Sequence, residues 1–349
     1  MKILVTGNMG YVGPGAISQL RESYPNAELI GYDTGFFANY LTNVSILPEA
    51  KLNKQIFGDV RNFDSNVLND IDAVVYLAAI SNDPMGNKFE DITMEVNYKS
   101  AVKIAKAGKE KGVKTFVFAS SCSVYGAAGE TAKVESDTLN PLTAYARSKI
   151  AAEKDLKVLA DNDFTVTCLR FATACGYSNR LRLDLVVNDF VAGALASKRI
   201  DILSDGTPWR PLINVLDMAR AIDWAVGRKA QNGGNFLVVN TGSNEWNYQV
   251  KELAEAVAEV VIGCKVTVNP DAPADKRSYN VNFDLFKKLA PNHQPIFKLK
   301  PTVSGLYENL KGMGFEDPDF RTKNLIRLNV INQLQKKGFL NKDLFWNWK

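Results

Sequence analysis

The first 33 residues constrain the fold more strongly than any other stretch of this 349-residue chain. Residues 2–6 form a short run of apolar, β-favouring side chains, which stops at residues 7–13, where three glycines stand three apart. Apolar residues at helical spacing follow, and a second strand-like run, 28–32, ends at Asp33. Glycine permits the positive φ angles and the close backbone approach that a tight turn requires. The stretch therefore predicts a strand, a glycine turn, a helix and a second strand.

This arrangement predicts a dinucleotide site. Amides at the start of a helix can bind a pyrophosphate with the helix dipole behind them. Asp33 lies 20 residues after Gly13, where a carboxylate binds a ribose hydroxyl in such sites. A purely structural turn is the alternative, and the order of the elements disfavours it. Residues 34–37 contain no arginine to offset the repulsion between Asp33 and a 2′-phosphate, so we expect NAD rather than NADP. The expected contacts from the turn are Gly7, Gly10, Tyr11, Val12 and Gly13.

Strands and helices continue to alternate along the chain, which predicts a right-handed, doubly wound parallel sheet of the α/β class. The expected strands are 55–57, 73–79, 115–119, 164–170 and 236–239. Between them we expect a loop over 80–88, a helix that runs through Asn97 and Ala107 and ends near Gly112, and a helix around Tyr145. A helix from 179–182 to about Ser197, a loop over 204–211 and a helix over 219–226 are expected further along the chain. Asp59 and Val60 follow a strand end, where they would flank the adenine.

Tyr145 and Lys149 are four residues apart, so on a helix they lie on the same face. A nearby ammonium favours a phenolate, so Lys149 would lower the pKa of Tyr145 and make it a base near neutral pH. A solvated helix face is the alternative. The serine-rich residues 120–126 follow strand 115–119 at its carboxyl end, where such sheets bind ligands. Hydroxyl groups bonded to the local backbone are the alternative there.

Composition excludes several classes of function. With 46% hydrophobic and 23% charged residues, the composition is typical of an ordinary globular protein. The net charge is only +4 and the lysines are scattered along the sequence, so nothing indicates a surface for nucleic acid or an anionic membrane. No apolar run resembles a signal peptide or a membrane span, so we expect a cytoplasmic protein. The four cysteines and the single histidine, His293, show no metal-type spacing, so we expect no metal.

Taken together, these stretches resemble the extended short-chain dehydrogenase/reductase family, in particular its NAD-dependent nucleotide-sugar epimerases and dehydratases. The resemblance covers most of the chain. It is carried by Gly7-x-x-Gly10-x-x-Gly13, Asp33, Asp59-Val60, Leu77-Ala78-Ala79, Asn97, residues 120–126, Tyr145-x-x-x-Lys149, Arg170 and Arg210. It implies a Rossmann-type NAD domain over 1–175, with a return segment at about 214–241. It also implies a smaller C-terminal α/β lobe over 176–213 and 242–349 that binds a nucleoside-diphosphate sugar.

The resemblance also implies roles for individual residues. Tyr145 takes a proton from a sugar hydroxyl while hydride passes to the nicotinamide, Lys149 holds the nicotinamide ribose and tunes Tyr145, and Ser121 bonds the reacting oxygen. Leu77, Ala78, Ala79 and Asn97 join the cofactor contacts, and Asn188, Arg210 and Arg277 are the expected diphosphate contacts. For the two arginines a surface salt bridge is the alternative, although a planar guanidinium suits phosphate oxygens. A homodimer through the helices containing Asn97 and Tyr145 is implied as well.

One departure from the family's pattern bears on which of its activities this chain has. Dehydratases of this family carry an acid and a base directly after the residue that Ser121 matches, whereas this chain has Cys122 and Ser123. Elimination of water needs both groups, so dehydration is disfavoured. We therefore predict a nucleotide-diphosphate-sugar epimerase that oxidises one carbinol, C4 favoured, and returns the hydride. A net reductase or dehydrogenase, a dehydratase and a non-catalytic NAD-binding protein remain alternatives.

Cys122 is a further candidate catalytic residue. A thiol with a lowered pKa next to a ketone can exchange a proton with carbon, which would permit epimerisation at C3 or C5. A small, half-buried side chain that only fills space is the favoured interpretation.

Overall fold

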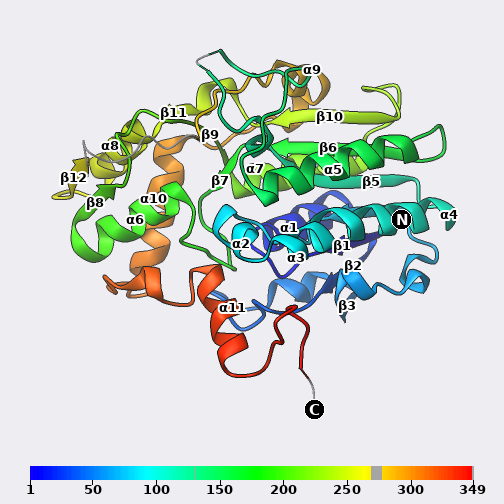
Figure 1. The fold of residues 1–349 in the computed structure, drawn as a ribbon, viewed down its shortest axis with the longest axis horizontal. Coiled ribbons are helices and arrows are strands. Elements are labelled where there is room, and N and C mark those ends of the chain that lie inside the picture. Colours follow the sequence, from blue (N-terminus) through cyan, green and yellow to red (C-terminus); the bar gives the residue numbers. More distant parts are fainter. Residues whose placement is uncertain (130, 269–276, 348–349) are drawn as a thin grey trace.

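A computed structural model of the chain describes residues 1–129, 131–268 and 277–347 (Figure 1). Residue 130 and two parts of the predicted second lobe, 269–276 and 348–349, lie outside the described residues. Within the described ranges no helix is both long enough and apolar enough to cross a membrane.

The larger lobe is built on a seven-stranded sheet in which every pair of neighbouring strands is parallel. Its order is β10-β6-β5-β4-β1-β2-β3, which confirms the predicted doubly wound sheet. All four residues of β4 are buried, as expected for a strand that is covered on both faces. The strands are β1 (Lys2–Thr6), β2 (Glu28–Asp33), β3 (Lys54–Phe57), β4 (Ala73–Tyr76), β5 (Thr115–Ser121), β6 (Thr165–Phe171) and β10 (Phe236–Thr241).

Two layers of helices bury the faces of this sheet (Figure 1). Apolar residues of α1 (Gly13–Ser23) and α7 (Val215–Gly227) share one core cluster with the sheet, whereas those of α4 (Ser100–Glu110) and α5 (Ala144–Leu159) share another. Before α4 the chain forms α2 (Asp83–Lys88), α3 (Glu90–Met94) and a π-helical turn (Glu95–Lys99). Because β10 pairs with β6, the segment from α7 to β10 belongs to this lobe.

The smaller lobe packs around its own apolar cluster, to which α6 (Val186–Ser197), α8 (Val250–Val260) and α10 (Leu299–Gly312) contribute. Two small sheets complete it. One has the order β11-β9-β7, and the other pairs β12 with β8. These strands are β7 (Thr173–Cys175), β8 (Arg199–Ile202), β9 (Trp209–Asn214), β11 (Asn247–Gln249) and β12 (Lys265–Val268), and a short helix α9 (Asp284–Leu289) lies near β10.

Three segments differ from the sequence prediction. The helix expected from 179–182 begins only at Val186, because the preceding arginines turn toward acidic partners and Leu183 N–H donates to the Leu325 carbonyl instead. The expected loop 80–88 contains α2, whose first turn is capped by the Asn82 side chain accepting from Met85 N. The expected loop 204–211 ends in β9, which starts at Trp209 because it pairs with β11.

The last part of the described chain, residues 326–347, returns from the smaller lobe to the larger one, and we call it the C-terminal segment. It contains α11 (Arg327–Lys336) and runs beside β2 and β3 (Figure 1). Trp346 Nε1 donates to the Thr34 carbonyl at 2.7 Å, and Arg61 donates to the Asp343 carbonyl at 2.6 Å. The C-terminal segment therefore covers the sheet edge at which Asp33 lies.

Candidate active site

A cavity of about 1020 Å³ lies between the two lobes, at the carboxyl ends of the central strands. Its walls include residues directly after β1 and β4, the last residues of β2, β5 and β6, and residues of β8 and β9 from the smaller lobe. This is the edge at which doubly wound sheets bind ligands. Among the described residues no group of three or more His, Cys, Asp or Glu side chains is placed to hold a metal ion.

The glycine turn brings the backbone close to this cavity. Gly7 has φ of +74°, and a Cβ atom there would stand 2.5 Å from the backbone nitrogen of Ala78. At Gly13 an added Cβ would stand 1.8 Å from the Asn8 carbonyl oxygen. Only glycine fits either position, so α1 starts directly against the turn. Gly7, Gly10, Tyr11 and Val12 line the cavity, whereas Gly13 packs behind it.

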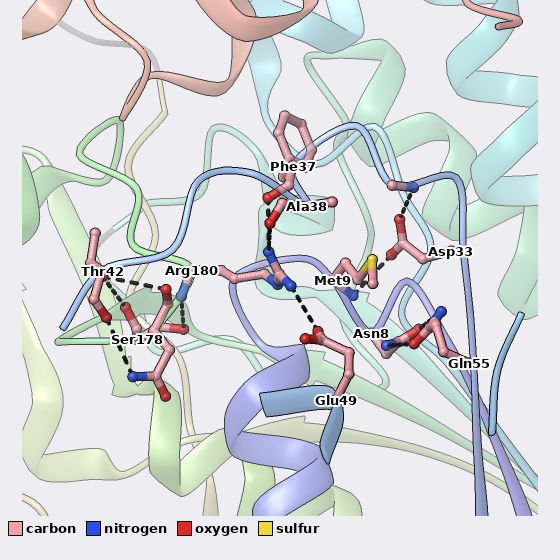
Figure 2. A network of polar contacts seen from close by, with 12 residues as sticks. Asn8, Met9, Asp33, Phe37, Ala38, Thr42, Glu49, Gln55, Ser178 and Arg180 are labelled. Carbon is pink, nitrogen blue, oxygen red and sulfur yellow. Dashed lines mark hydrogen bonds and ion pairs between the residues drawn. The ribbon is translucent and has the colours of Figure 1, made fainter. Parts of the chain in front are cut away.

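Asp33 lines the cavity at the end of β2, as predicted from its spacing. Its carboxylate accepts from Met9 N at 3.0 Å and from Gly35 N at 2.7 Å, so it joins the glycine turn to the loop after β2 (Figure 2). Burial raises the pKa of Asp33, while these two amides and the nearby Arg180 act in the opposite direction. The other predicted cofactor residues on this side also line the cavity: Asp59, Val60, Leu77, Ala78 and Ala79.

The loop after β2 is held by Arg180 from the smaller lobe. Its guanidinium donates to the carbonyl oxygens of Phe37 at 2.9 Å and Ala38 at 2.8 Å and forms an ion pair with Glu49 at 2.8 Å (Figure 2). Only 1% of the side chain of Arg180 is exposed. The two lobes are therefore joined at the part of the cavity next to Asp33.

At the other side of the glycine turn, α5 and β5 bring Tyr145, Lys149 and Ser121 together on the cavity wall. Thr143 caps α5 by accepting from Ala146 N, which fixes the first turn that carries Tyr145. The Lys149 ammonium lies 5.5 Å from the centroid of the Tyr145 ring and donates to the Ala119 carbonyl at 2.7 Å. The predicted pair is therefore at one site, with the hydroxyl of Ser121 as its neighbour.

The pKa values correct one part of the prediction. Burial raises the pKa of Tyr145 to about 12, and the hydrogen bond with Ser121 and the charge of Arg182 act in the lowering direction. Lys149 is not among the largest causes of this shift. Burial lowers the pKa of Lys149 itself to about 7, against the effect of Glu153. Within the chain, burial therefore outweighs the lowering of the Tyr145 pKa that the sequence predicted, and added positive charge would favour the phenolate.

Two predicted diphosphate contacts, Arg210 and Arg277, meet on the cavity wall although they are far apart in the sequence. Arg210 donates to the backbone carbonyl of Arg277, and Arg277 forms an ion pair with Asp83 of α2 at 2.8 Å. Guanidinium groups at a cavity wall suit phosphate oxygens. The arginines lie on β9 and just before Tyr279, so the smaller lobe supplies them.

The side chains of Asn97 and Asn188 do not line the cavity. Asn97 is fully buried, accepts from Ile80 N at 2.8 Å and donates to Ile80 O at 3.0 Å, so it holds the loop after β4. Asn188 accepts from Gly176 N at 2.9 Å and donates to Arg182 O at 2.9 Å. Both amides are used inside the protein, so the structure assigns them positioning roles.

The structure does not support a reactive role for Cys122. The side chain is fully buried outside the cavity wall, and its thiol donates to the Arg170 carbonyl at 3.1 Å. Burial raises the pKa of Cys122, because the thiolate would lose its hydration. The electropositive setting considered from the sequence is outweighed by this burial.

Sequence reasoning missed several charged residues of the cavity. Arg182 binds Asp184 through two hydrogen bonds of 2.6 and 2.9 Å and donates to Ser81 Oγ at 2.9 Å. These residues line the wall next to Tyr145. Because residues 179–182 were expected to begin a helix, Arg182 and Asp184 were not predicted as cavity residues. Arg61 and Arg327 also line the cavity, and no local signal in the sequence indicated either.

Comparison with known proteins identifies the family. A family model described as "NAD dependent epimerase/dehydratase family" matches residues 3–242. The chain belongs to this family. It is 29% identical over 279 residues, 77% of this chain and 84% of the relative, to the "Uncharacterized UDP-glucose epimerase YtcB" of Bacillus subtilis (strain 168). It is 28% identical over 279 residues, 74% of this chain and 80% of the relative, to the "UDP-glucose 4-epimerase" of Corynebacterium glutamicum.

A solved structure of MoeE5 in complex with UDP-glucose and NAD has the same fold. Its TM-score is 0.75, with 25% sequence identity over 89% of this chain and 99% of MoeE5. The chain is thus an NAD-dependent enzyme of the epimerase/dehydratase family, with an extended short-chain dehydrogenase/reductase fold.

The residues present fit the NAD that this family uses. The turn between β1 and α1 lines the cavity with Gly7, Gly10, Tyr11 and Val12 directly before the start of α1, where backbone amides suit a pyrophosphate. Asp33 stands at the end of β2 for a ribose hydroxyl, and Lys149 and Tyr145 line the continuation of the same cavity.

Proposed function

We propose that this protein is an NAD-dependent epimerase of nucleoside-diphosphate sugars, with C4 of the sugar as the favoured centre. The observation that carries the proposal is that Tyr145, Lys149 and Ser121 line the same cavity as Arg210 and Arg277. The first three can handle the proton of a sugar hydroxyl, and the two arginines can bind a diphosphate. The names of the relatives favour a uridine diphosphate. The division into an NAD lobe and a nucleotide-sugar lobe belongs to the same proposal.

In this mechanism Tyr145 holds and moves one proton at its phenolic oxygen. When bound, NAD would supply a reversible hydride acceptor for the carbinol carbon, and in its oxidised form it would also supply a positive charge. Because burial raises the pKa of Tyr145 to about 12, added positive charge next to the ring favours the phenolate. Tyr145 then accepts the hydroxyl proton as the carbinol becomes a ketone, and it returns the proton when the sugar is reduced on its other face.

The neighbouring residues position this proton transfer. Ser121 hydrogen-bonds Tyr145 and thereby favours its charged form. Lys149 sits behind the ring of Tyr145, anchored to the Ala119 carbonyl. Elimination of water would need an acid and a base beside Ser121, and the next two residues are Cys122, which is buried, and Ser123, neither of which is a carboxylic acid. This supports epimerisation over dehydration within the family.

The test incubates the purified protein with UDP-, dTDP-, GDP- and CDP-sugars without added cofactor. We expect an epimer in the NMR spectrum and no net NADH at 340 nm. Tyr145→Phe should reduce turnover by about 10²- to 10⁴-fold, the usual contribution of a general base. Tyr307→Phe, which removes a hydroxyl outside the cavity, is the matched control.

Other outcomes of the same assay would identify the alternatives. A product that forms only with stoichiometric NAD(P)H indicates a net reductase or dehydrogenase. A 4-keto-6-deoxy or unsaturated sugar indicates a dehydratase. Stoichiometric NAD binding without turnover of any nucleotide sugar, unaffected by Tyr145→Phe, indicates a non-catalytic binding protein.

We also propose a homodimer that pairs the helices containing Asn97 and Tyr145. Val158 of α5 is 81% exposed, so this helix still has an apolar side chain to bury. Sedimentation velocity at working concentration should give about twice the mass of one chain. A monomer under those conditions contradicts the proposal.

A further inference from the structure

Arg327 differs from the other buried arginines of the described chain. Arg170, Arg180 and Arg182 each form an ion pair with a carboxylate. Arg228 has none, but its guanidinium donates to the hydroxyl of Thr167 and to three backbone carbonyls. Arg327 is 2% exposed, and no ion pair connects it to any described residue.

The hydrogen bonds of Arg327 leave most of its donors unused. Nη2 donates to the Arg180 carbonyl at 2.7 Å, whereas the buried Nη1 has no hydrogen-bond partner among the described residues. The guanidinium also lies 4.2 Å from the centroid of the Phe37 ring. A buried donor without an acceptor is unfavourable, and a buried charge without a counter-charge is more so. The arrangement is therefore incomplete without an anion.

The surroundings make that charge still less favourable in the protein alone. Burial and the like charges of Arg182 and Arg180 lower the pKa of Arg327 to about 9, although the carboxylates of Asp184 and Asp33, which form no ion pair with it, act in the raising direction. Arg327 is also the first residue of α11, whose N-cap Ile326 makes no side-chain capping bond. The positive end of this ten-residue helix thus adds to the charge of the guanidinium. Both Ile326 and Arg327 line the cavity.

The position of Arg327 indicates which part of a ligand it meets. Its contacts are Phe37, in the loop after Asp33, and Arg180, which holds that loop against the smaller lobe. Figure 2 shows that Arg180 and Asp33 lie on either side of the glycine turn, close to Met9. This is the dinucleotide end of the cavity. Arg210 and Arg277 lie in another part of the wall, because Arg210 belongs to β9 and Arg277 forms its ion pair with Asp83 of α2.

We propose that Arg327 binds the pyrophosphate of NAD, so that the C-terminal segment is part of the dinucleotide site. The family match ends at residue 242, so this contact comes from a part of the chain that the match does not cover. The contact closes the cavity on the side of Asp33, where Leu344 of the same segment is also in the wall. The inference rests on the NAD site of the proposed function, but not on the sugar chemistry.

The first test measures binding by titration calorimetry to protein from which nucleotide has been removed. The probes are NAD, ADP and adenosine. Arg327→Gln should weaken NAD and ADP by about 10- to 100-fold, the usual effect of losing a charge-assisted hydrogen bond. Adenosine should bind equally to both proteins. Arg327→Lys should retain part of the affinity for ADP. Lys336→Gln, which removes an exposed charge from the same helix, should change none of the three affinities.

A second measurement uses the unaltered chain, because Arg327→Gln could also disturb the packing of α11. Hydrogen exchange of amides 326–336 should slow with ADP or NAD and remain unchanged with adenosine. Equal protection by ADP and adenosine overturns the proposal. So does an equal loss of affinity for all three probes in Arg327→Gln. ADP and adenosine carry no sugar to epimerise, so these outcomes are independent of the epimerase assay.

Discussion

The ammonium of Lys149 donates its hydrogen bond to the backbone carbonyl of Ala119, 2.7 Å away, rather than to a carboxylate. Of the charges that raise the pKa of Lys149, that of Glu153 has the largest effect, and Glu153 is itself bound to Arg170. A carbonyl stabilises an ammonium less than an opposite charge does, so burial dominates and the pKa of Lys149 falls to about 7.

We expect this lysine to make stability depend on pH. In the unfolded chain the pKa of lysine is 10.5, so between pH 7 and 10.5 the unfolded state binds more protons than the folded state. The free energy of unfolding of nucleotide-free protein should therefore rise with pH across this window. Lys149→Met removes the effect. In urea unfolding, the Lys149→Met protein should be more stable than the unaltered chain. This difference in the free energy of unfolding should be about 2 to 3 kcal/mol larger at pH 6.5 than at pH 9.

Lys336→Met is the control for this comparison, because that lysine is exposed on α11. Its effect on the free energy of unfolding is subtracted from that of Lys149→Met at each pH. A remaining difference that does not change with pH would show that Lys149 titrates normally in the folded protein.

Cys122→Ser should retain most of the epimerase activity. The thiol is fully buried and donates only to the Arg170 carbonyl, a bond that a serine hydroxyl can also make. Turnover in D₂O, followed by NMR, should leave no deuterium on the sugar carbons, because the hydrogen at the reacting carbon returns from the cofactor. Deuterium at C3 or C5 that disappears in Cys122→Ser would instead assign proton transfer at carbon to this thiol.

The parts of the site that could be predicted are those whose geometry is local. The glycine turn and the spacing of Tyr145 and Lys149 are set by one turn of helix or one strand end, so a few neighbouring residues determine them. The pKa of Tyr145 could not be predicted, because the dominant cause is burial, which depends on the packing of the whole lobe.

Site residues that lie far from the others in the sequence could not be predicted from local sequence patterns. Arg327 lies 294 positions after Asp33, and only the return of the C-terminal segment places it at the dinucleotide end of the cavity. The start of α6 was misplaced for a related reason. Leu183 donates its N–H to Leu325, so a tertiary contact replaces the helical bond that the local pattern favoured.

Gly13→Ala should prevent stable folding or cost at least about 3 kcal/mol, as expected for a severe clash in a packed site. The new Cβ would stand 1.8 Å from the Asn8 carbonyl oxygen, so either the turn or α1 must move. Gly305→Ala, in the exposed part of α10, meets nothing within 4 Å and should be neutral or stabilise by up to about 1 kcal/mol. Thermal unfolding of both variants measures the contrast. A Gly13→Ala protein with unchanged stability and NAD content would contradict the close packing of α1 against the turn.

Asp33→Asn should shift the dinucleotide preference toward NADP. Asp33 is near enough to Arg180 and Arg327 for their charges to influence one another. Loss of the carboxylate removes the repulsion of a 2′-phosphate and leaves these guanidinium groups in place. The ratio of NADP to NAD affinity should rise at least about 10-fold in calorimetric titrations, which corresponds to about 1.4 kcal/mol.

The same substitution should also lower thermal stability, because one of the two carboxylate oxygens that accept from Met9 N and Gly35 N becomes an NH₂ group, which cannot accept. Asp70→Asn, at a side chain that is 83% exposed, is the control and should change neither property. If NADP binding stays as weak in Asp33→Asn as in the unaltered chain, the exclusion of the 2′-phosphate must come from the shape of the cavity wall and not from the charge of Asp33.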